Sequence, residues 1–493
     1  MGTTAQKLQA IKNSKEYIRQ AINEKGVALT SAAPLSTYAD AIKRISTGGE
    51  YDPDIATEYR EHNRDGAWPA MMLPSEMGDS SDKIVILLDL NCPSRYVDLD
   101  FGSSDISQMV VQVSRYNDTT LVNTESISLT SAHFQKYFSP TPNQNTNYLV
   151  IDIEGARGAI TTLKIGGTAT AATDKVPDAG ILEISGNCAA TAISMNTQMS
   201  FMRTMSMQYF SFYGIACGTA NTLFFNYQRY NMPFSSNLQA IPEMRFAQSS
   251  VSLELMFANS KNLRCVDEMF VDGINVSNMD STFYNCYSLT YIGEIVTFTS
   301  NFPTTGTFGW AFRNCKALNY LPVYRIPEGN YTYGCNYMYS GCSAIKDVDA
   351  IYSDLDGNGF KNVVGDYIFQ NCGITYIPDT FIEGSNQNFT NMFSGCPIVT
   401  FEGSLNGTST LTNQNAFTSC QSIYLTNITR SLDIRNSTEG LYNLYTKPFL
   451  LEIFNNGLQT VTTPQTLTVG AAALALLSDQ DKAIATDKGW TLA

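Results

Sequence analysis

The chain has 493 residues, of which 43% are hydrophobic and only 15% charged, and its formal net charge is -14. This length indicates several domains, and the absence of any lysine and arginine cluster speaks against nucleic acid or an anionic membrane surface as a partner. With two histidines, His62 and His133, a three-histidine metal site is excluded and no histidine-based catalytic dyad can be argued.

Residues 1–50 carry a helical pattern. An apolar stripe over 5–24 predicts an amphipathic helix, and Ser36 is placed to cap a second, shorter one. We therefore expect a helical hairpin, which either packs on its own chain or docks and oligomerises; its position at the end of the chain favours docking. It lacks the apolar core of a secretory signal, and no run of 18 apolar residues follows, so we expect cytoplasmic synthesis and no membrane span.

Residues 51–180 change to β-rich runs separated by Asn, Pro, Gly and Ser clusters. The runs lie at 83–90, 107–114, 148–155 and 161–166. Their alternation and spacing predict a β-sandwich-like domain. Asp152 and Glu154 share a face of one strand, and glycosidases use such carboxylate pairs. Two acids on an exposed strand are more commonly solvated, so we assign them no catalytic role.

Residues 181–236 are crowded with aromatic side chains and fit two descriptions. They form either an N-terminal cap of the following solenoid or its irregular first coils. A buried cap is favoured over a binding surface.

Residues 237–437 contain a repeat, in which an aromatic residue is followed by cysteine three positions later and by two aliphatic residues at further intervals of three. An example is FYNCYSLTYI from Phe283, and successive repeats start 26, 29, 27, 30, 24 and 24 residues apart. Units of this length cannot bury an apolar face alone, so they predict a solenoid whose short extended pieces pair in parallel. The spacing of aromatic and cysteine predicts one turn of 3₁₀ or α helix.

Stacking would turn each repeated position into a ladder inside one core. The predicted structural ladder consists of Phe257, Phe283, Phe312, Tyr339, Phe369, Phe393, Phe417, Cys286, Cys315, Cys342, Cys372, Cys396 and Cys420. Disulfides or a metal site are the alternatives for these cysteines. A reduced, buried role is favoured, because free cysteine is a good small core residue. Ser260 takes the cysteine position in the first repeat, and no role is assigned to Cys265 and Cys335.

Residues 438–493 predict an α-helical C-terminal cap. Ser478 and Asp481 have the spacing of a capping box, Gly489 stops the helix, and Trp490 can fold back on the last coil. A cap is expected because an open solenoid end would expose core and strand edges.

One segment resembles a calcium loop. Asp354, Asp356 and Asn358 alternate before Gly359, but Gly365 stands where a glutamate ligand is needed. An inserted turn is favoured over calcium, so we expect no metal, no cofactor and no catalytic residue.

The repeats resemble the BspA-type leucine-rich repeats of bacterial surface proteins and gut phages. LTVGAAALALLSDQDKAIATDKGWTLA resembles the C-terminal segment of phage-encoded members, and residues 8–45 resemble the N-terminal module of tail-fibre and related virion proteins. AWPAMMLPSE at 67–76 resembles a segment that precedes β-domains in that group, which includes crAss-like phages. The resemblance covers residues 5–46 and 234–493.

This resemblance implies a structural, non-enzymatic virion protein located on the particle. We expect a tail fibre or fibre adaptor with other virion proteins as partners, a homo-oligomer with a trimer favoured, and recognition of a host-surface glycan. A head fibre or capsid decoration protein, a bacterial or prophage adhesin, and a polysaccharide depolymerase are the alternatives. The binding residues stay unassigned.

Overall fold

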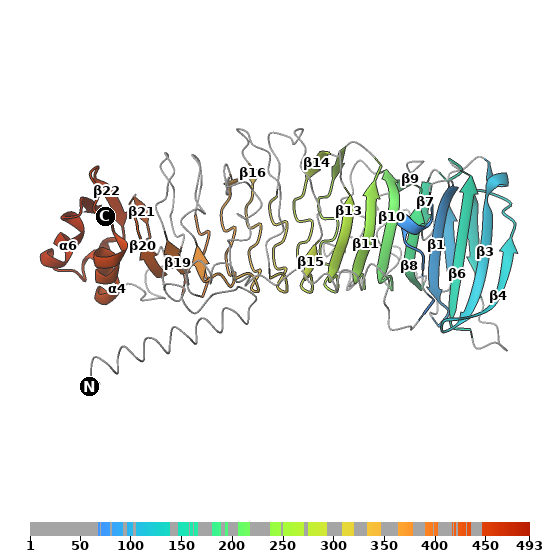
Figure 1. The fold of residues 1–493 in the computed structure, drawn as a ribbon, viewed down its shortest axis with the longest axis horizontal. Helices are drawn as coiled ribbons and strands as arrows, with labels where there is room; N and C mark the ends of the chain where they lie inside the picture. Colours follow the sequence, from blue (N-terminus) through green and yellow to red (C-terminus); the bar gives the residue numbers. More distant parts are fainter. Residues whose placement is uncertain are drawn as a thin grey trace, which may run out of the picture. The chain divides into compact units, whose positions relative to one another are not determined.

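The structure, a computed structural model, describes residues 68–69, 71–78, 81–91, 96–101, 105–138, 146–156, 158–160, 162–165, 180–188, 193–195, 206–216, 237–247, 250–270, 275–292, 308–319, 333–346, 363–377, 390–397, 399–402, 417, 419–420, 423–429, 431–434 and 446–493. The chain divides into two compact units, Met1–Asp52 and Pro53–Ala493. The first unit, with the predicted helical hairpin, lies outside the described residues. The described part is mainly β, with a solenoid of about six turns in its C-terminal region and few helices (Figure 1), which confirms the expectation of a mainly β chain with a solenoid.

The first strands form two antiparallel sets. One has the order β4-β3-β6-β1, and in the other β2 lies between β5 and β7. The strands are β1 (Ser81–Asp89), β2 (Tyr96–Asp100), β3 (Val110–Asn117), β4 (Thr120–Ile127), β5 (His133–Tyr137), β6 (Tyr148–Ala156) and β7 (Thr162–Ile165). Val97 and Phe134 of the second set belong to the same buried cluster as Ile86 of the first, so the two sets share one core.

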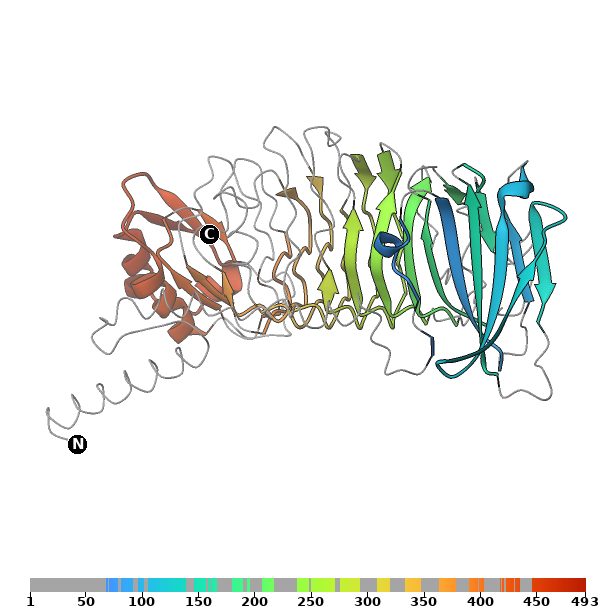
Figure 2. The ribbon, with the colours of Figure 1, turned by 45° about the vertical axis from the view of Figure 1, so that its right-hand side comes forward.

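Strand β1 is buried on both faces along residues 84–88, which explains the continuous apolar run IVILL there. Ile84 and Ile86 face the shared core, while Val85 and Leu87 pack with Met71 in a second cluster. That second cluster is covered by the segment at residues 68–69 and 71–78, here called the strap, whose short blue turn crosses the sheet in Figure 2.

Hydrogen bonds from distant strands hold the strap. The Ser75 hydroxyl donates to Oε1 of buried Glu243 at 2.8 Å, and the Ser75 amide donates to Oε2 at 3.1 Å. Asn187 donates to the carbonyl oxygen of Pro74 at 2.9 Å, and the Ser185 hydroxyl to that of Met72 at 2.6 Å. The buried carboxylate of Glu243 needs hydrogen-bond donors, and Ser75 supplies them. These bonds hold the strap against one face of the sheet. The sequence AWPAMMLPSE thus includes much of the strap.

The sheet continues without a break from antiparallel into parallel pairing. β8 pairs antiparallel with β1, and each later strand in the series pairs parallel with its predecessor. The series is β8 (Ile181–Asn187), β10 (Tyr209–Ala216), β11 (Ala240–Phe246), β13 (Cys265–Phe270) and β15 (Tyr291–Ile292). Figure 1 shows them following β1 side by side. β9 (Ile193–Met195) pairs with β7 and with the end of β10. β10 therefore pairs with β8, which continues the first antiparallel set, and with β9, which continues the second.

The described part of 181–236 therefore consists of parallel-paired coils. Phe210 and Phe212 are fully buried in them. Later rungs repeat the parallel pairing in short strands, as β12–β14, β16–β17 and β18–β19–β20. These strands are β12 (Ser250–Ser252), β14 (Asn275–Asn278), β16 (Tyr333–Gly334), β17 (Val363–Val364), β18 (Tyr376–Ile377), β19 (Val399–Glu402) and β20 (Ile423–Thr426).

The C-terminal part combines a three-stranded parallel sheet with short helices. Its elements are β21 (Leu432–Asp433), α4 (Lys447–Glu452), a π-helical turn (Ile453–Gly457), β22 (Gln465–Thr468), α5 (Ala471–Leu474), α6 (Asp479–Thr486) and β23 (Trp490–Leu492). Trp490 is buried and donates its indole N–H to the carbonyl oxygen of Gln459 at 2.8 Å. The Lys488 ammonium donates to the carbonyl oxygens of Phe454, Asn455 and Leu458, so a cation satisfies the end of the π-helical turn.

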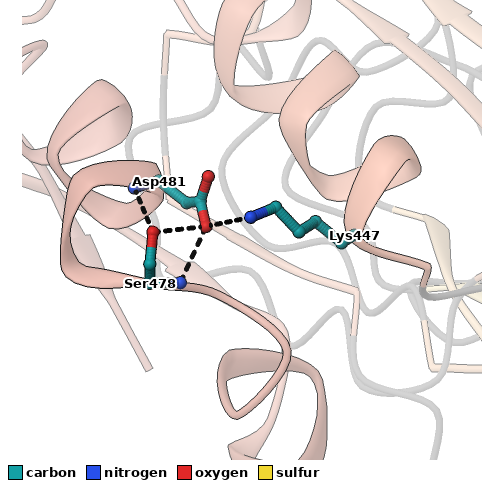
Figure 3. Close-up of polar contacts among 3 residues, drawn as sticks. All are labelled: Lys447, Ser478 and Asp481. Carbon is teal, nitrogen blue, oxygen red and sulfur yellow. Dashed lines mark hydrogen bonds and ion pairs between the residues drawn. The ribbon is translucent and has the colours of Figure 1, made fainter.

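The predicted capping box begins α6 (Figure 3). The Asp481 amide donates to Ser478 Oγ at 3.3 Å, and the Ser478 amide donates to Asp481 Oδ2 at 2.7 Å. Lys447 Nζ lies 2.7 Å from the same Oδ2, so the cap also connects α4 to α6. The hydrogen bonds from Lys447 and Ser478 lower the pKa of Asp481 to about 2.

We expect Lys447→Met to raise the pKa of Asp481 toward its ordinary value of about 3.9. The lowered pKa means that this carboxylate stabilises the fold above about pH 4 and loses that effect as pH falls through about 2. An NMR titration of the Asp481 carboxyl carbon measures the shift. Lys482→Met, on the same helix, is the control and should leave the titration unchanged; an equal response in both variants would contradict the pairing.

Candidate functional site

Six of the seven rungs turn around the core aromatic residue through two left-handed positions, and at Phe417 only the second of them, Ser419, is described. At Phe283 these are Ser281 (φ 57°) and Asn285 (φ 62°), two residues before and two after. The Cys286 amide donates to the carbonyl oxygen of Phe283, as a 3₁₀ turn would. The left-handed residue between them stops any helix from forming. The predicted helical turn is therefore wrong, and the aromatic–cysteine spacing reflects a left-handed turn.

Alternate amides in this turn bond to the next rung. Phe283 N donates to the carbonyl oxygen of Ala311 at 2.8 Å, and Asn285 N to that of Arg313 at 2.9 Å. The same pattern recurs where Phe312 N donates to Met338 O at 2.8 Å. The positive φ values give every second N–H a partner along the stack, which satisfies backbone groups in a segment without strands.

The seven core aromatics form one stack. Adjacent ring centroids lie from 5.2 Å apart (Phe257 and Phe283) to 5.9 Å apart (Phe393 and Phe417). The planes of adjacent rings differ by 4° to 13°. All seven side chains are buried, so the ladder joins successive rungs into one core.

The six ladder cysteines make one repeated contact. Each thiol donates to the carbonyl oxygen of the core aromatic residue in the preceding rung, at 3.0 to 3.3 Å. The pairs are Cys286–Phe257, Cys315–Phe283, Cys342–Phe312, Cys372–Tyr339, Cys396–Phe369 and Cys420–Phe393. The nine cysteines that the structure describes are all free and buried.

Burial raises the pKa of five of the ladder thiols, those of Cys286, Cys315, Cys372, Cys396 and Cys420. The pKa of Cys420 rises to about 12, and burial moves those of Cys286 and Cys396 further in the same direction. Cys335, off the ladder, is buried in the same core with a pKa of about 12. Such thiols stay protonated and are neither nucleophiles nor metal ligands near neutral pH. Within the described residues, no group of three or more His, Cys, Asp or Glu side chains could hold a metal ion.

An asparagine ladder lies beside the cysteines. Asn314 donates its amide N–H to Asn285 Oδ1, and Asn285 donates to Asn259 Oδ1, both at 2.9 Å. The next rung has Gly341 (φ 81°), where a Cβ would lie 2.3 Å from Asn314 Oδ1. Glycine therefore ends the ladder because the neighbouring amide fills the space of a side chain.

Replacing Asn285 separates the contribution of its amide hydrogen bonds from that of its left-handed backbone conformation. We expect Asn285→Ala to lower the free energy of unfolding by about 2–4 kcal/mol, because two amide hydrogen bonds are lost and alanine is strained at positive φ. Asn285→Gly should cost roughly 1 kcal/mol less, since glycine tolerates this conformation. Urea unfolding measures both variants. Equal losses would show that the left-handed position does not constrain the residue.

The other sequence candidates do not converge on one site. Asp152 forms an ion pair with Lys83 at 3.1 Å, while Glu154 is exposed on the same strand. His133 lies exposed on β5. The calcium candidates Asp354, Asp356 and Asn358, and also His62, lie outside the described residues.

A second, outward ladder of aromatic residues was not predicted from the sequence. Trp310, Tyr337 and Tyr367 each lie two residues before a core aromatic, at the left-handed position. Trp310 lies 5.5 Å from Tyr337 and 5.6 Å from Tyr284 between ring centroids, and Tyr337 lies 4.6 Å from Tyr367. The detectable signal was an aromatic at this position in three successive repeats.

Cations accompany these rings. The Arg313 guanidinium lies 4.2 Å from the centroid of Trp310 and 4.8 Å from that of Tyr337. Lys316 and Lys261 lie 5.1 and 5.8 Å from the centroid of Tyr287. We call the group around Trp310 the outward face; it consists of Tyr284, Trp310, Arg313, Tyr337 and Tyr367.

No family model, curated protein or solved structure matches the chain.

Proposed function

We propose that the chain is a structural protein of a bacteriophage particle, a tail-fibre or fibre-adaptor subunit that presents its solenoid for recognition of a host-surface glycan. In this proposal the N-terminal module attaches to the particle and assembles the chain, with a trimer favoured. The repeats are BspA-type leucine-rich repeats, the first strands a β-sandwich-like spacer, and the C-terminal helices a cap. The chain is not an enzyme.

The continuous rung stack is the observation that carries this proposal. Aromatic, cysteine and asparagine ladders connect neighbouring rungs, and backbone hydrogen bonds follow the same direction. Such an array holds a long surface in fixed register, as a recognition element needs, and its cysteines have no reactive role.

The strap and the C-terminal part support a structural role further. The strap packs on β1 through apolar side chains and is hydrogen-bonded to β8 and β11, so the spacer and the first coils form one body. At the other end, Trp490 and Lys488 complete the C-terminal part. A solenoid that is packed at both ends suits the role of a rigid connector. It suits less well the role of an enzyme domain that opens and closes around a substrate.

Immunogold labelling tests the proposal. Fab fragments against the solenoid are applied to purified particles from lysates of the cells that produce the chain. Gold at tail tips or along fibres supports the tail-fibre role, and gold around the capsid would assign a head fibre or decoration protein instead. Labelling of intact uninfected cells with none on particles would overturn the virion assignment and favour an adhesin.

A further inference from the structure

The outward face carries aromatic side chains where the backbone favours other residues. Trp310, Tyr337 and Tyr367 have φ values of 60°, 57° and 62°, a left-handed conformation that costs bulky residues energy. Asn391 occupies the same position in the rung that follows Tyr367, with φ 54°. Because asparagine is adequate for the fold there, the three aromatics indicate a role outside folding.

The rings of the outward face contact one another, and Trp310 is an exposed ring among them. Tyr337 and Tyr367 stack with planes only 3° apart, so their faces cover each other. Trp310 is tilted by 62° from Tyr337 and by 53° from Tyr284, and its side chain is 37% exposed. No hydrogen bond among the described residues uses the indole N–H or the hydroxyls of these tyrosines. The face therefore offers an apolar surface surrounded by available donors and acceptors.

Arg313, the cation of the outward face, forms no ion pair with another residue that the structure describes, although the whole chain has a net charge of -14. Arg313 is held by contact with two rings, so its planar fork is oriented in advance for a carboxylate.

We propose that the outward face binds a carboxylate-bearing polysaccharide. A sugar ring packs its C–H face on Trp310, its hydroxyls bond to the tyrosine edges, and its carboxylate pairs with Arg313. This assignment rests on the proposed recognition function and names its ligand class and residues. Single-stranded nucleic acid fits less well, because the stacked tyrosine faces leave no room for bases and the acidic chain repels a polyphosphate.

The test uses variants that copy residues found at the same position in other rungs. Trp310→Asn copies Asn391, and Arg313→Gln copies Gln370, so neither should disturb the fold. Tyr137→Ser, at a 53% exposed aromatic on β5, is the control. Binding of the full chain to alginate, hyaluronan, polysialic acid, neutral dextran and oligothymidylate is measured by surface plasmon resonance at two salt concentrations.

The expected result is salt-dependent binding to at least one of the three carboxylated polymers and none to dextran. Trp310→Asn and Arg313→Gln should weaken it by roughly 10-fold or more, and Tyr137→Ser should not change it. Binding to none of the three, equal binding to dextran or oligothymidylate, or undiminished binding by both variants would overturn the assignment. A changed oligomeric mass of Trp310→Asn would also overturn it, because the face would then join copies of the chain. Particle labelling is independent of these outcomes, so a failure here leaves the virion role standing.

Discussion

Phe312→Ala is expected to lower the free energy of unfolding by about 3–5 kcal/mol. The ring is fully buried, 5.3 Å from Phe283 and 5.4 Å from Tyr339 between centroids, with interplanar angles of 11° and 9°. Its removal leaves a cavity between two rungs and deletes two stacking contacts, which add about 0.5–1.5 kcal/mol each to the buried area. Because a solenoid is stabilised by neighbouring units, the loss affects both adjacent interfaces. Urea unfolding followed by circular dichroism measures it.

Tyr137→Ala is the matched control for this prediction. It removes an aromatic ring that is 53% exposed, and we expect a change within about 0.5 kcal/mol. If the two variants lost similar, small amounts of stability, the aromatic stack would not be the core of the solenoid.

Alkaline pH is expected to unfold the protein through its buried thiols. The pKa of Cys420 is raised from an ordinary value near 9 to about 12 by burial. The unfolded chain therefore releases this proton between pH 9 and 12 while the folded chain keeps it. The stabilisation is complete below about pH 9 and is lost as pH rises toward 12, at about 1.4 kcal/mol per pH unit for each such thiol. Cys286, Cys396 and Cys335 are raised in the same direction and add to the slope.

Cys420→Ser isolates one thiol from the other alkaline titrations. Serine keeps a donor for the carbonyl oxygen of Phe393 but does not ionise in this range. The difference in free energy of unfolding between wild type and variant should shift by about 1.4 kcal/mol per pH unit from pH 9 upward. Parallel stability curves would contradict a raised thiol pKa.

Iodoacetamide at pH 8 should leave the nine described cysteines unmodified until urea unfolds the chain.

The sequence predicted the elements whose pattern is local and repeated. β1, β6 and β7 overlap their predicted runs almost residue for residue. The run predicted at 107–114 became β3 at Val110–Asn117, because Ile106–Gln108 forms a 3₁₀ turn capped by Asp105. β4 was missed, since seven of its eight residues are exposed and no alternation marks it.

The left-handed turns were also visible in the sequence. Asparagine or glycine follows the core aromatic by two residues in six of the seven repeats, with serine in the last; all seven have positive φ. The positions are Asn259, Asn285, Asn314, Gly341, Asn371, Gly395 and Ser419. The helical turn was predicted from the spacing of aromatic and cysteine alone, without the residue between them.

Long-range pairing could not be predicted from any local pattern. Ser75 of the strap bonds to Glu243, which is 168 residues away in the sequence. β10 pairs with β8 and with β9, which extend different sets of the first strands. The outward face also depends on register, because Tyr284 meets Trp310 from a different repeat position in the neighbouring rung. These contacts became recognisable only once the rungs were stacked.

A cryo-EM reconstruction of intact particles, combined with mass spectrometry of their proteins, tests the virion role most directly. The account predicts peptides of this chain in purified particles and projecting density that fits the rung stack. The outward face should be open to solvent in that density. Particles with complete density and no peptide of this chain would contradict the account.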